Sequence, residues 1–463
     1  MRSLTSLPLA NGPAWQDRPA VFRGPDAWTW GELHAAALAL AAELPTRGTV
    51  CNLCHGRVGF LVGWLAALRR GCQQVLPPSG GPADLAALLG EAVEPVVLAD
   101  DPQILQPGWN ALARCVVIRP ERLAATAAHW TPDARQLRVR LYTSGSTGRP
   151  EAQDKSLAQL AEGAVVLGQR LEAELDGGLG SLQGLVCSVP PQHMFGLEAS
   201  VMLALVHGLP CLDERPLLPA DVRAAFERCK KRDEGEGRWA WITTPLHLRA
   251  LVRAGESLPH CGLVLASTMP LAPGIAAQAE ARVAAPVLEI YGSTETGAVA
   301  LRRTAREPLW RALPGVTLSP AAEGTEAHGT HFSSPQTLAD QIEPEGAVGF
   351  RLLGRQADLL KIAGRRASLA GLNLLLQDLP GLDDGVFYLP ASGEPAERLV
   401  LIHAGAPLDR AAALAWLRER LDPAFLPRAF IHVDALPRSG PGKLARTALD
   451  ALYAQWAAQR RAP

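Results

Sequence analysis

Lysine is scarce in this chain of 463 residues, since only five of its 45 basic residues are lysine and the others are arginine. A lysine that remains in such a chain indicates a place where a compact, rotatable ammonium is needed. An excess of charge of either sign is also lacking, because 45 basic residues stand against 46 acidic ones. This balance excludes the broad basic surface with which proteins bind nucleic acid or anionic membranes.

Long apolar runs are absent as well, and we expect no export signal. The nearest candidate for a membrane span, residues 33–44, is interrupted by polar side chains and is shorter than the roughly 18 residues that a span needs. Residues 1–8 contain no apolar segment of the length that secretion requires. The eight cysteines are scattered without a pairing pattern, which suits a reducing compartment. We therefore expect a cytoplasmic protein without membrane insertion.

Up to about residue 300, short apolar strands alternate with helical stretches. Strands are predicted at 49–53, 74–76, 95–98, 115–118, 139–143, 185–189, 239–243, 263–266 and 287–291. Helices are predicted at 31–44, 58–70, 157–171, 197–206, 220–229, 246–254 and 274–281. This order is typical of parallel sheets with helices on both faces. Residues 314–345 instead predict short strands and loops, and a final αβ segment has helices at 369–378 and 410–421.

A strand that ends at Thr143 runs into a loop rich in hydroxyl groups and glycine. The loop contains, in order, Ser144, Gly145, Ser146, Thr147 and Gly148. Glycines let backbone N–H groups converge on an anion, and hydroxyls add rotatable donors. No Gly-Lys-Ser/Thr string follows, which excludes a Walker loop, and no G-x-S-x-G frame marks a nucleophile elbow. The string indicates a phosphate-binding loop of another kind.

This loop is similar to the phosphate loop of the AMP-forming adenylating enzymes, which include acyl- and aryl-CoA synthetases, adenylation domains of peptide synthetases, and luciferases. Four further segments resemble that family's motifs in the family's order: 190–196 beside the acyl pocket, 290–297 for adenine and magnesium, 354–364 at the hinge, and 437–446 for the C-terminal lysine loop. The resemblance implies an α/β fold. It implies a large N-terminal domain, residues 1–354, of two stacked αβ subdomains with a reduced β-barrel, and a small, mobile C-terminal α+β lid, residues 355–463.

The resemblance also implies a two-step reaction that uses ATP and Mg²⁺. A carboxylate attacks the α-phosphate of ATP to give an acyl-adenylate and pyrophosphate, and a pantetheine thiol of acyl carrier protein or CoA then displaces AMP. Residues matched to ATP or AMP binding are Thr143, Ser144, Gly145, Ser146, Thr147, Gly148, Ser267, Thr268, Met269, Tyr291, Gly292, Asp340 and Arg355. Residues matched to catalysis are Lys443, Glu295, Thr294 and His193. Glu295 is expected to hold Mg²⁺, because a bare carboxylate would repel the phosphates.

The chain departs from the family pattern in its phosphate loop and in its hinge. Glu151 follows the loop proline where the family commonly has lysine, and Lys155 is a candidate substitute cation. The hinge is assigned to Arg355, Ala357 and Asp358, with Ala357 in place of the usual carboxylate. Asp340, assigned to the ribose, lacks the usual Thr-Gly-Asp string.

Residues matched to the acyl pocket are His193, Phe195, Gly196 and Trp241. The strand at 239–243, with Trp239 and Trp241, supplies bulky walls that favour a small or planar carboxylic acid over a long chain. The compact build resembles ligases that load aromatic or short acyl starters onto acyl carrier protein in aryl-polyene-type pathways. Free CoA alone as the acceptor, a non-catalytic binding subunit and an oxygenase of the luciferase kind remain the alternatives. The sequence leaves the identity of the acid and the oligomeric state open.

Overall fold

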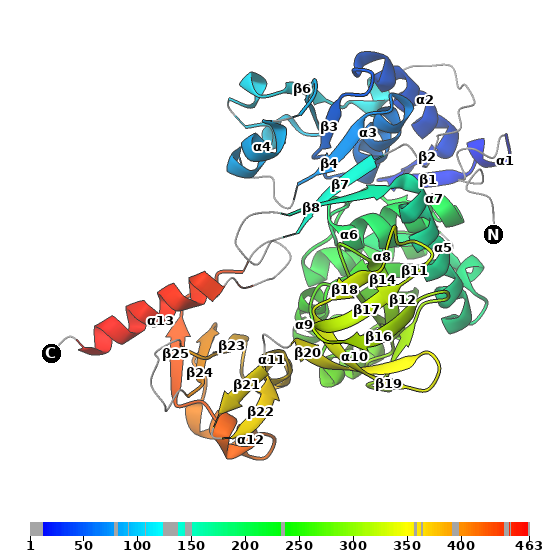
Figure 1. The fold of residues 1–463 in the computed structure, drawn as a ribbon. Helices are drawn as coiled ribbons and strands as arrows, with labels where there is room; N and C mark the ends of the chain where they lie inside the picture. The colour runs from blue at the N-terminus through cyan, green and yellow to red at the C-terminus, as the bar shows by residue number, and fades with distance from the viewer. Residues whose placement is uncertain are drawn as a thin grey trace.

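The computed structural model describes residues 13–77, 82–90, 92–106, 108–123, 138–143, 151–232, 237–355, 359–362, 364–390, 398–438, 444 and 446–461. Within these residues the strands form one sheet of eleven strands, one of six, two of three and one of two. Figure 1 shows the six-stranded sheet stacked against the eleven-stranded sheet, with the C-terminal elements as a separate smaller body. The predicted mixed α/β class is confirmed.

The six-stranded sheet has the order β6-β5-β3-β4-β7-β8. Its strands are β3 (Thr49–Asn52), β4 (Gln73–Leu76), β5 (Val96–Ala99), β6 (Arg114–Val117), β7 (Arg138–Thr143) and β8 (Glu151–Ser156). Its helices are α2 (Trp30–Glu43), α3 (Arg57–Arg69) and α4 (Pro82–Leu89). All neighbouring strands run parallel except β8, which pairs antiparallel with β7.

The eleven-stranded sheet has the order β19-β20-β15-β14-β13-β12-β11-β9-β10-β1-β2. Its strands are β1 (Pro19–Arg23), β2 (Asp26–Thr29), β9 (Leu182–Cys187), β10 (Cys211–Leu212), β11 (Arg238–Thr243), β12 (Cys261–Ala266), β13 (Val287–Ser293), β14 (Gly297–Arg302), β15 (Trp310–Ala312), β19 (Asp340–Glu345) and β20 (Gly349–Arg355). The strands from β1 to β13 in this order run parallel, and from β14 to β19 they alternate in direction.

Helices cover the large sheet because its central strands are apolar on both faces. They are α5 (Leu157–Glu174), α6 (Met194–Gly196), a π-helix (Leu197–Met202), α7 (Leu203–His207), α8 (Pro219–Arg232), α9 (Pro245–Ala254) and α10 (Pro273–Val283). On β11, Trp239 and Trp241 pack with α8 and α9, whereas Ala240 and Ile242 face the core on the other side. Ser156 starts α5 with a capping box that fixes where β8 ends.

The buried helix α3 connects the two sheets. Nearly every residue from Arg57 to Leu68 is buried, as expected for a helix that is apolar on all sides. The guanidinium of Arg57 donates to the backbone oxygen of Val189 over 2.8 Å, just beyond the end of β9. This bond connects α3, which packs on the six-stranded sheet, to the carboxyl end of β9 in the large sheet.

Apart from β19 and β20, the strands after β15 form small sheets, of which β16–β18 lie beside the large sheet in Figure 1, whereas those from residue 359 onward make up the smaller body. The elements after β15, apart from β19 and β20, are β16 (Thr317–Ala321), β17 (Gly324–His328), β18 (Gln336–Leu338), β21 (Leu359–Ile362), β22 (Arg365–Ser368), α11 (Leu369–Leu376), β23 (Asp384–Tyr388), β24 (Val400–Ala404), α12 (Arg410–Arg418), β25 (Ala429–Val433) and α13 (Arg446–Arg461). The predicted domain boundary, at 354–355, falls at the end of β20. The body beyond this boundary contacts the large one, because its Asp384 forms an ion pair with Arg249 of α9 at 3.6 Å.

The nine predicted strands are all present, and so are the predicted helices, although residues 197–202 form a π-helix rather than an α-helix. The sequence analysis missed β8, because its residues Glu151–Ser156 are almost all polar and lack an apolar alternation. It also missed the long C-terminal helix α13, whose Tyr453 and Trp456 pack against the last sheet. None of the described helices is long and apolar enough to cross a membrane.

A buried carboxylate on β13 joins three segments of the large sheet. Glu289 is 3% exposed. Its Oε1 accepts from the backbone N–H of Leu271 over 2.9 Å, and its Oε2 accepts from Arg302 Nε over 2.8 Å and from Thr304 Oγ1 over 2.6 Å. Because Leu271 follows β12 and Arg302 ends β14, this network fixes β13 between its two neighbours.

We expect the Glu289→Ala variant to lose about 3–5 kcal/mol of the free energy of unfolding, because it removes a buried carboxylate and breaks its bonds to Leu271, Arg302 and Thr304. Urea denaturation followed by tryptophan fluorescence measures this loss. The matched control is Glu343→Ala, which removes an exposed carboxylate on β19 and should change stability by less than about 0.5 kcal/mol. Equal midpoints for the two variants would contradict the role of Glu289.

Candidate active site

The candidate site lies where parallel strands of the large sheet end. In open α/β sheets, ligands bind outside the carboxyl ends of the strands. Ser267, Thr268 and Met269 follow β12, and Tyr291 and Gly292 lie in the last part of β13. Ser267 Oγ donates to the backbone oxygen of Ile290 over 3.0 Å and joins these two strand ends. The predicted adenine-side residues are therefore neighbours in space.

Tyr291, Asp340 and Arg355 come together although they lie far apart in the sequence. The hydroxyl of Tyr291 donates to Asp340 Oδ2 over 3.1 Å, and Arg355 Nε lies 3.5 Å from Asp340 Oδ1. Asp340 and Arg355 are directly opposed in the β19–β20 pair. Burial, and then the charge of Asp340, raises the pKa of the Tyr291 hydroxyl, which therefore stays a hydrogen-bond donor at neutral pH.

Thr268 adopts a backbone conformation that β-branched residues rarely use. Its φ is 83°, in the left-handed region, and its hydroxyl is buried without a hydrogen-bond partner among the described residues. Strain of this kind clusters at functional sites, where the surrounding structure holds a residue in place. The conformation fits the assignment of residues 267–269 to the nucleotide side of the site.

The hairpin between β13 and β14 carries the predicted catalytic pair Thr294 and Glu295 at its tip. Ser293 and Thr296 bond each other's backbone and side chain, with Thr296 Oγ1 accepting from the Ser293 N–H over 3.1 Å. This closes the turn, so Thr294 and Glu295 are half-buried beside the strand ends. The charge of Glu295 acts on the nearby Lys155 and opposes the effect of burial, which lowers the pKa of that lysine.

The site fits Mg²⁺ held together with a nucleotide. No group of three or more His, Cys, Asp or Glu side chains that could hold a metal exists among the described residues. Mg²⁺ in nucleotide sites is usually bound by one or two carboxylates plus substrate phosphates, rather than by a cage of protein ligands. The half-buried carboxylate of Glu295 fits that requirement.

Two buried charged side chains lie beneath the hairpin. Lys155, 5% exposed, donates from Nζ to the backbone oxygen of Glu295 over 2.6 Å. Glu198, 4% exposed, accepts from the backbone N–H of Ala298 at Oε2 over 2.8 Å. Burial lowers the pKa of Lys155, and it raises the pKa of Glu198 to about 7 against the opposing effects of Ala298 and Lys155.

His331 completes this buried group. Its Nε2 lies 3.1 Å from the backbone oxygen of Ala298, and burial lowers the pKa of His331 to about 4. The imidazole is therefore neutral at physiological pH. Glu198 and His331 were missed by the sequence analysis, although a glutamate inside the apolar run of residues 197–205 was a signal for Glu198.

The predicted acyl segment, residues 190–196, is tightly folded on itself. Gly196 has no room for a side chain, because a Cβ there would lie 2.0 Å from the backbone oxygen of Pro190. His193 and Phe195 are half-buried. Trp241 is wholly buried between β11 and the helices α8 and α9, with its indole N–H donating to Ser188 Oγ over 2.8 Å. The structure thus gives Trp241 to the core, and its predicted place in the acyl pocket is not supported.

Several predicted site residues lie outside the described residues. They are Ser144, Gly145, Ser146, Thr147, Gly148, Ala357, Asp358 and Lys443. The strands on either side of the predicted phosphate loop lie within the described residues. Thr143 at the end of β7 pairs with Glu151 at the start of β8. Phosphate binding, the hinge pivot and the role of the C-terminal lysine stay predictions.

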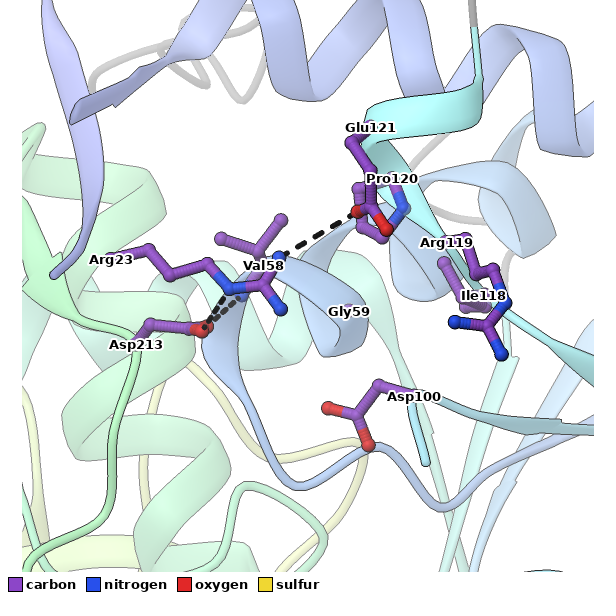
Figure 2. A pocket seen from close by; sticks show the side chains of 9 residues that line it. All are labelled: Arg23, Val58, Gly59, Asp100, Ile118, Arg119, Pro120, Glu121 and Asp213. Carbon is purple, nitrogen blue, oxygen red and sulfur yellow. Dashed lines mark hydrogen bonds and ion pairs between the residues drawn. The ribbon is translucent and has the colours of Figure 1, made fainter. Parts of the chain in front are cut away.

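A small cavity elsewhere contains none of the predicted site residues. It has a volume of about 70 Å³ and lies beside the start of α3, as Figure 2 shows. Asp213 accepts there from the Val58 N–H over 2.8 Å, and Arg23 forms ion pairs with Asp213 at 3.4 Å and Glu121 at 3.7 Å. Because these charges are already paired with each other, the cavity is a less suitable anion site than the strand ends.

Comparisons with known proteins agree with this geometry. A family model described as AMP-binding enzyme matches residues 10–328. The 4-coumarate–CoA ligase of Cereibacter sphaeroides is 26% identical over 323 residues, covering 68% of this chain and 72% of that protein. The 3-hydroxybenzoate–CoA ligase of Aromatoleum sp. (strain CIB) is 24% identical over 516 residues, covering 94% and 93%. The crystal structure of the anthranilate CoA ligase AuaEII in complex with anthranoyl-AMP matches with a TM-score of 0.84 at 14% identity, covering 98% of each chain.

The strand ends and the hairpin define a nucleotide-binding enzyme of the mixed α/β class. The chain belongs to the AMP-binding enzyme family, because the family model matches well over half of its length. The predicted superfamily is confirmed, and so is the prediction of an AMP-forming acid–thiol ligase.

We expect Gly292→Ala to weaken nucleotide binding more than it weakens the fold. A Cβ at Gly292 would lie 2.1 Å from the backbone oxygen of Gly297, so the hairpin must open and Glu295 must move. Calorimetric titration with AMP and a thermal melt measure the two effects. Gly180→Ala is the control, because nothing lies within 4 Å of a Cβ there. AMP affinity equal to that of the control would show that the hairpin tolerates the methyl group.

Proposed function

We propose that this protein activates a small carboxylic acid, aromatic or short-chain, with ATP and transfers it to a pantetheine thiol. The observation that carries the proposal is the convergence of Tyr291, Asp340 and Arg355 beside the Thr294–Glu295 turn. These residues provide an aromatic ring, a carboxylate, a guanidinium and a second carboxylate at one edge of the sheet. The aromatic ring suits an adenine, and the first carboxylate suits the ribose hydroxyls. The guanidinium and the second carboxylate suit a metal-bound polyphosphate.

Each described residue has a distinct task in this proposal. The ring of Tyr291, supported by Trp310 at a centroid distance of 5.5 Å, lies against adenine. Asp340 accepts from the ribose hydroxyls. Thr294 donates to the α-phosphate, where negative charge increases during attack. Glu295 holds Mg²⁺, which neutralises phosphate charge when bound.

The remaining predicted residues act on the phosphates and the acid. Thr143, Ser144, Ser146 and Thr147 hold the β- and γ-phosphates, and Lys443 bridges the carboxylate and the α-phosphate. His193, Phe195 and Gly196 border the path along which the acid and the pantetheine meet. Because Gly196 packs directly on Pro190, this border is rigid on one side.

A small or planar acid is favoured for two reasons. Two of the relatives that match most of the chain are named for 4-coumarate and 3-hydroxybenzoate, which are both aromatic acids. The predicted acyl-pocket side chains His193 and Phe195 carry planar rings, which are suited to contact an aromatic acid. Both acyl carrier protein and CoA carry the same thiol arm, so either is a suitable acceptor.

The test is acid-dependent exchange of labelled pyrophosphate into ATP, screened over benzoates, cinnamates and short and long fatty acids. We expect exchange with aromatic or short acids and little with long ones. Thioester formation with CoA and with a pantetheinylated carrier protein then identifies the acceptor. Absence of exchange with every acid would overturn the proposed function and favour a non-catalytic binding subunit.

We expect Asp340→Ala to raise the KM for ATP about 10- to 100-fold, since a hydrogen bond to a charged group is worth about 1.5–3 kcal/mol. The variant should also stop distinguishing ATP from 2′,3′-dideoxy-ATP, because the ribose hydroxyls no longer have their acceptor. Tyr291→Phe, which removes only the 3.1 Å bond to Asp340, is the control and should retain that discrimination. Discrimination that survives in Asp340→Ala would place the ribose elsewhere.

A further inference from the structure

We propose that Lys155 and Glu198 are positioning residues that hold the Glu295–Ala298 turn from beneath, so that Glu295 keeps its carboxylate directed at the metal and the phosphates. The inference rests on the proposed function, because it assigns these two residues a part in adenylation. It gives Lys155 a task that differs from direct phosphate binding by a substitute cation.

The two contacts lie on either side of the turn. The ammonium of Lys155 donates to the Glu295 oxygen over 2.6 Å, and Glu198 accepts from the Ala298 N–H over 2.8 Å. One side chain donates to a backbone carbonyl and the other accepts from a backbone N–H. The peptide groups at both ends of the turn therefore have fixed orientations. Charged partners make such bonds about twice as strong as neutral ones.

The two residues come from the segments that flank the other motifs. Lys155 lies on β8, which leaves the phosphate loop, opposite Val139 of β7. Glu198 lies on the π-helix that directly follows the predicted acyl segment. The turn is therefore tied to both the phosphate side and the acid side of the site. A shift in either segment would move Glu295.

The surrounding chain makes room for these charges. A Cβ at Gly163 of α5 would lie 2.7 Å from Glu198 Oε1, and a Cβ at Gly297 would lie 2.8 Å from the same atom. Gly297 also has a φ of 75°, which other residues rarely adopt. The π-helix at Glu198 widens the backbone, and such bulges are frequent at functional sites.

Burial argues for positioning rather than for direct contact with a polyphosphate. Lys155 is 5% exposed and its ammonium is already bonded to a backbone oxygen. Buried charges are costly unless they are compensated, and Lys155 and Glu198 each favour the charged form of the other. Such a pair suits a fixed support better than a group that must follow a leaving pyrophosphate.

The first experiment compares Lys155→Met with the wild type and with Lys230→Met, which removes an exposed lysine on α8. We expect Lys155→Met to slow pyrophosphate exchange about 10- to 100-fold, as small displacements of catalytic groups do. The Mg²⁺ concentration for half-maximal rate should rise at fixed ATP, while the KM for the acid stays within about twofold. Lys230→Met should behave as the wild type. An unchanged Mg²⁺ requirement in Lys155→Met would overturn the inference.

The second experiment needs no nucleotide. Amide hydrogen exchange of residues 293–298 in the free protein should be faster in Lys155→Met than in the wild type, because the turn loses its anchor. An exchange rate unchanged in the free protein, together with a higher KM for ATP alone, would show direct phosphate binding and overturn the positioning role.

The double variant Lys155→Met/Glu198→Gln separates folding from positioning. It replaces the buried carboxyl group that Lys155→Met leaves without a cation by a neutral amide, so its melting temperature should recover towards that of the wild type. Its Mg²⁺ requirement should stay high, since nothing then bonds the Glu295 carbonyl. Full recovery of both properties would overturn the inference. Failure of the wild type to exchange with any acid would overturn the proposed function alone, because the amide exchange result stands without it.

Discussion

The turn between β13 and β14 is held by buried charges on both faces of its strands, and the geometry of the site depends on it. Glu289 fixes β13 to β12 and β14 through Leu271, Arg302 and Thr304. Lys155 bonds the carbonyl of Glu295 at the tip. Because these contacts lie in a region of low dielectric, they are directional and strong. The backbone of the turn is therefore held in one conformation, with Glu295 at its tip.

The nucleotide side of the site combines two kinds of sheet geometry. Parallel strands β12 and β13 end at one edge, where residues 267–269 and Tyr291 meet. Antiparallel strands β19 and β20 then bring Asp340 and Arg355 opposite each other and towards Tyr291. The ends of the parallel strands form one side of the site. The antiparallel strands bring residues from later in the chain next to that side. A ligand there contacts residues that are separated by many positions in the sequence.

The local patterns that predicted the fold were those with a strong physical cause. Apolar β-rich runs such as Cys261–Ala266 and Val287–Ser293 had to be buried, and all nine predicted strands are present. The polar strand β8 was missed, since its pairing with β7 and the 2.7 Å ion pair between Arg140 and Asp154 leave no apolar pattern in the sequence. Trp241 was assigned to the acyl pocket by its bulk, but the alternation of β11 turns it to the core.

The sequence by itself determined the mixed α/β class and the family, because motifs and apolar periodicity are local, and it predicted the nucleotide-side residues. Only the tertiary structure decided which polar residues meet. The bond between Tyr291 and Asp340, and the two buried charges beneath Glu295, depend on strand order and on the space left by Gly163 and Gly297. No local pattern carries such information, since each contact joins segments whose distance is set by the packing of whole sheets and helices.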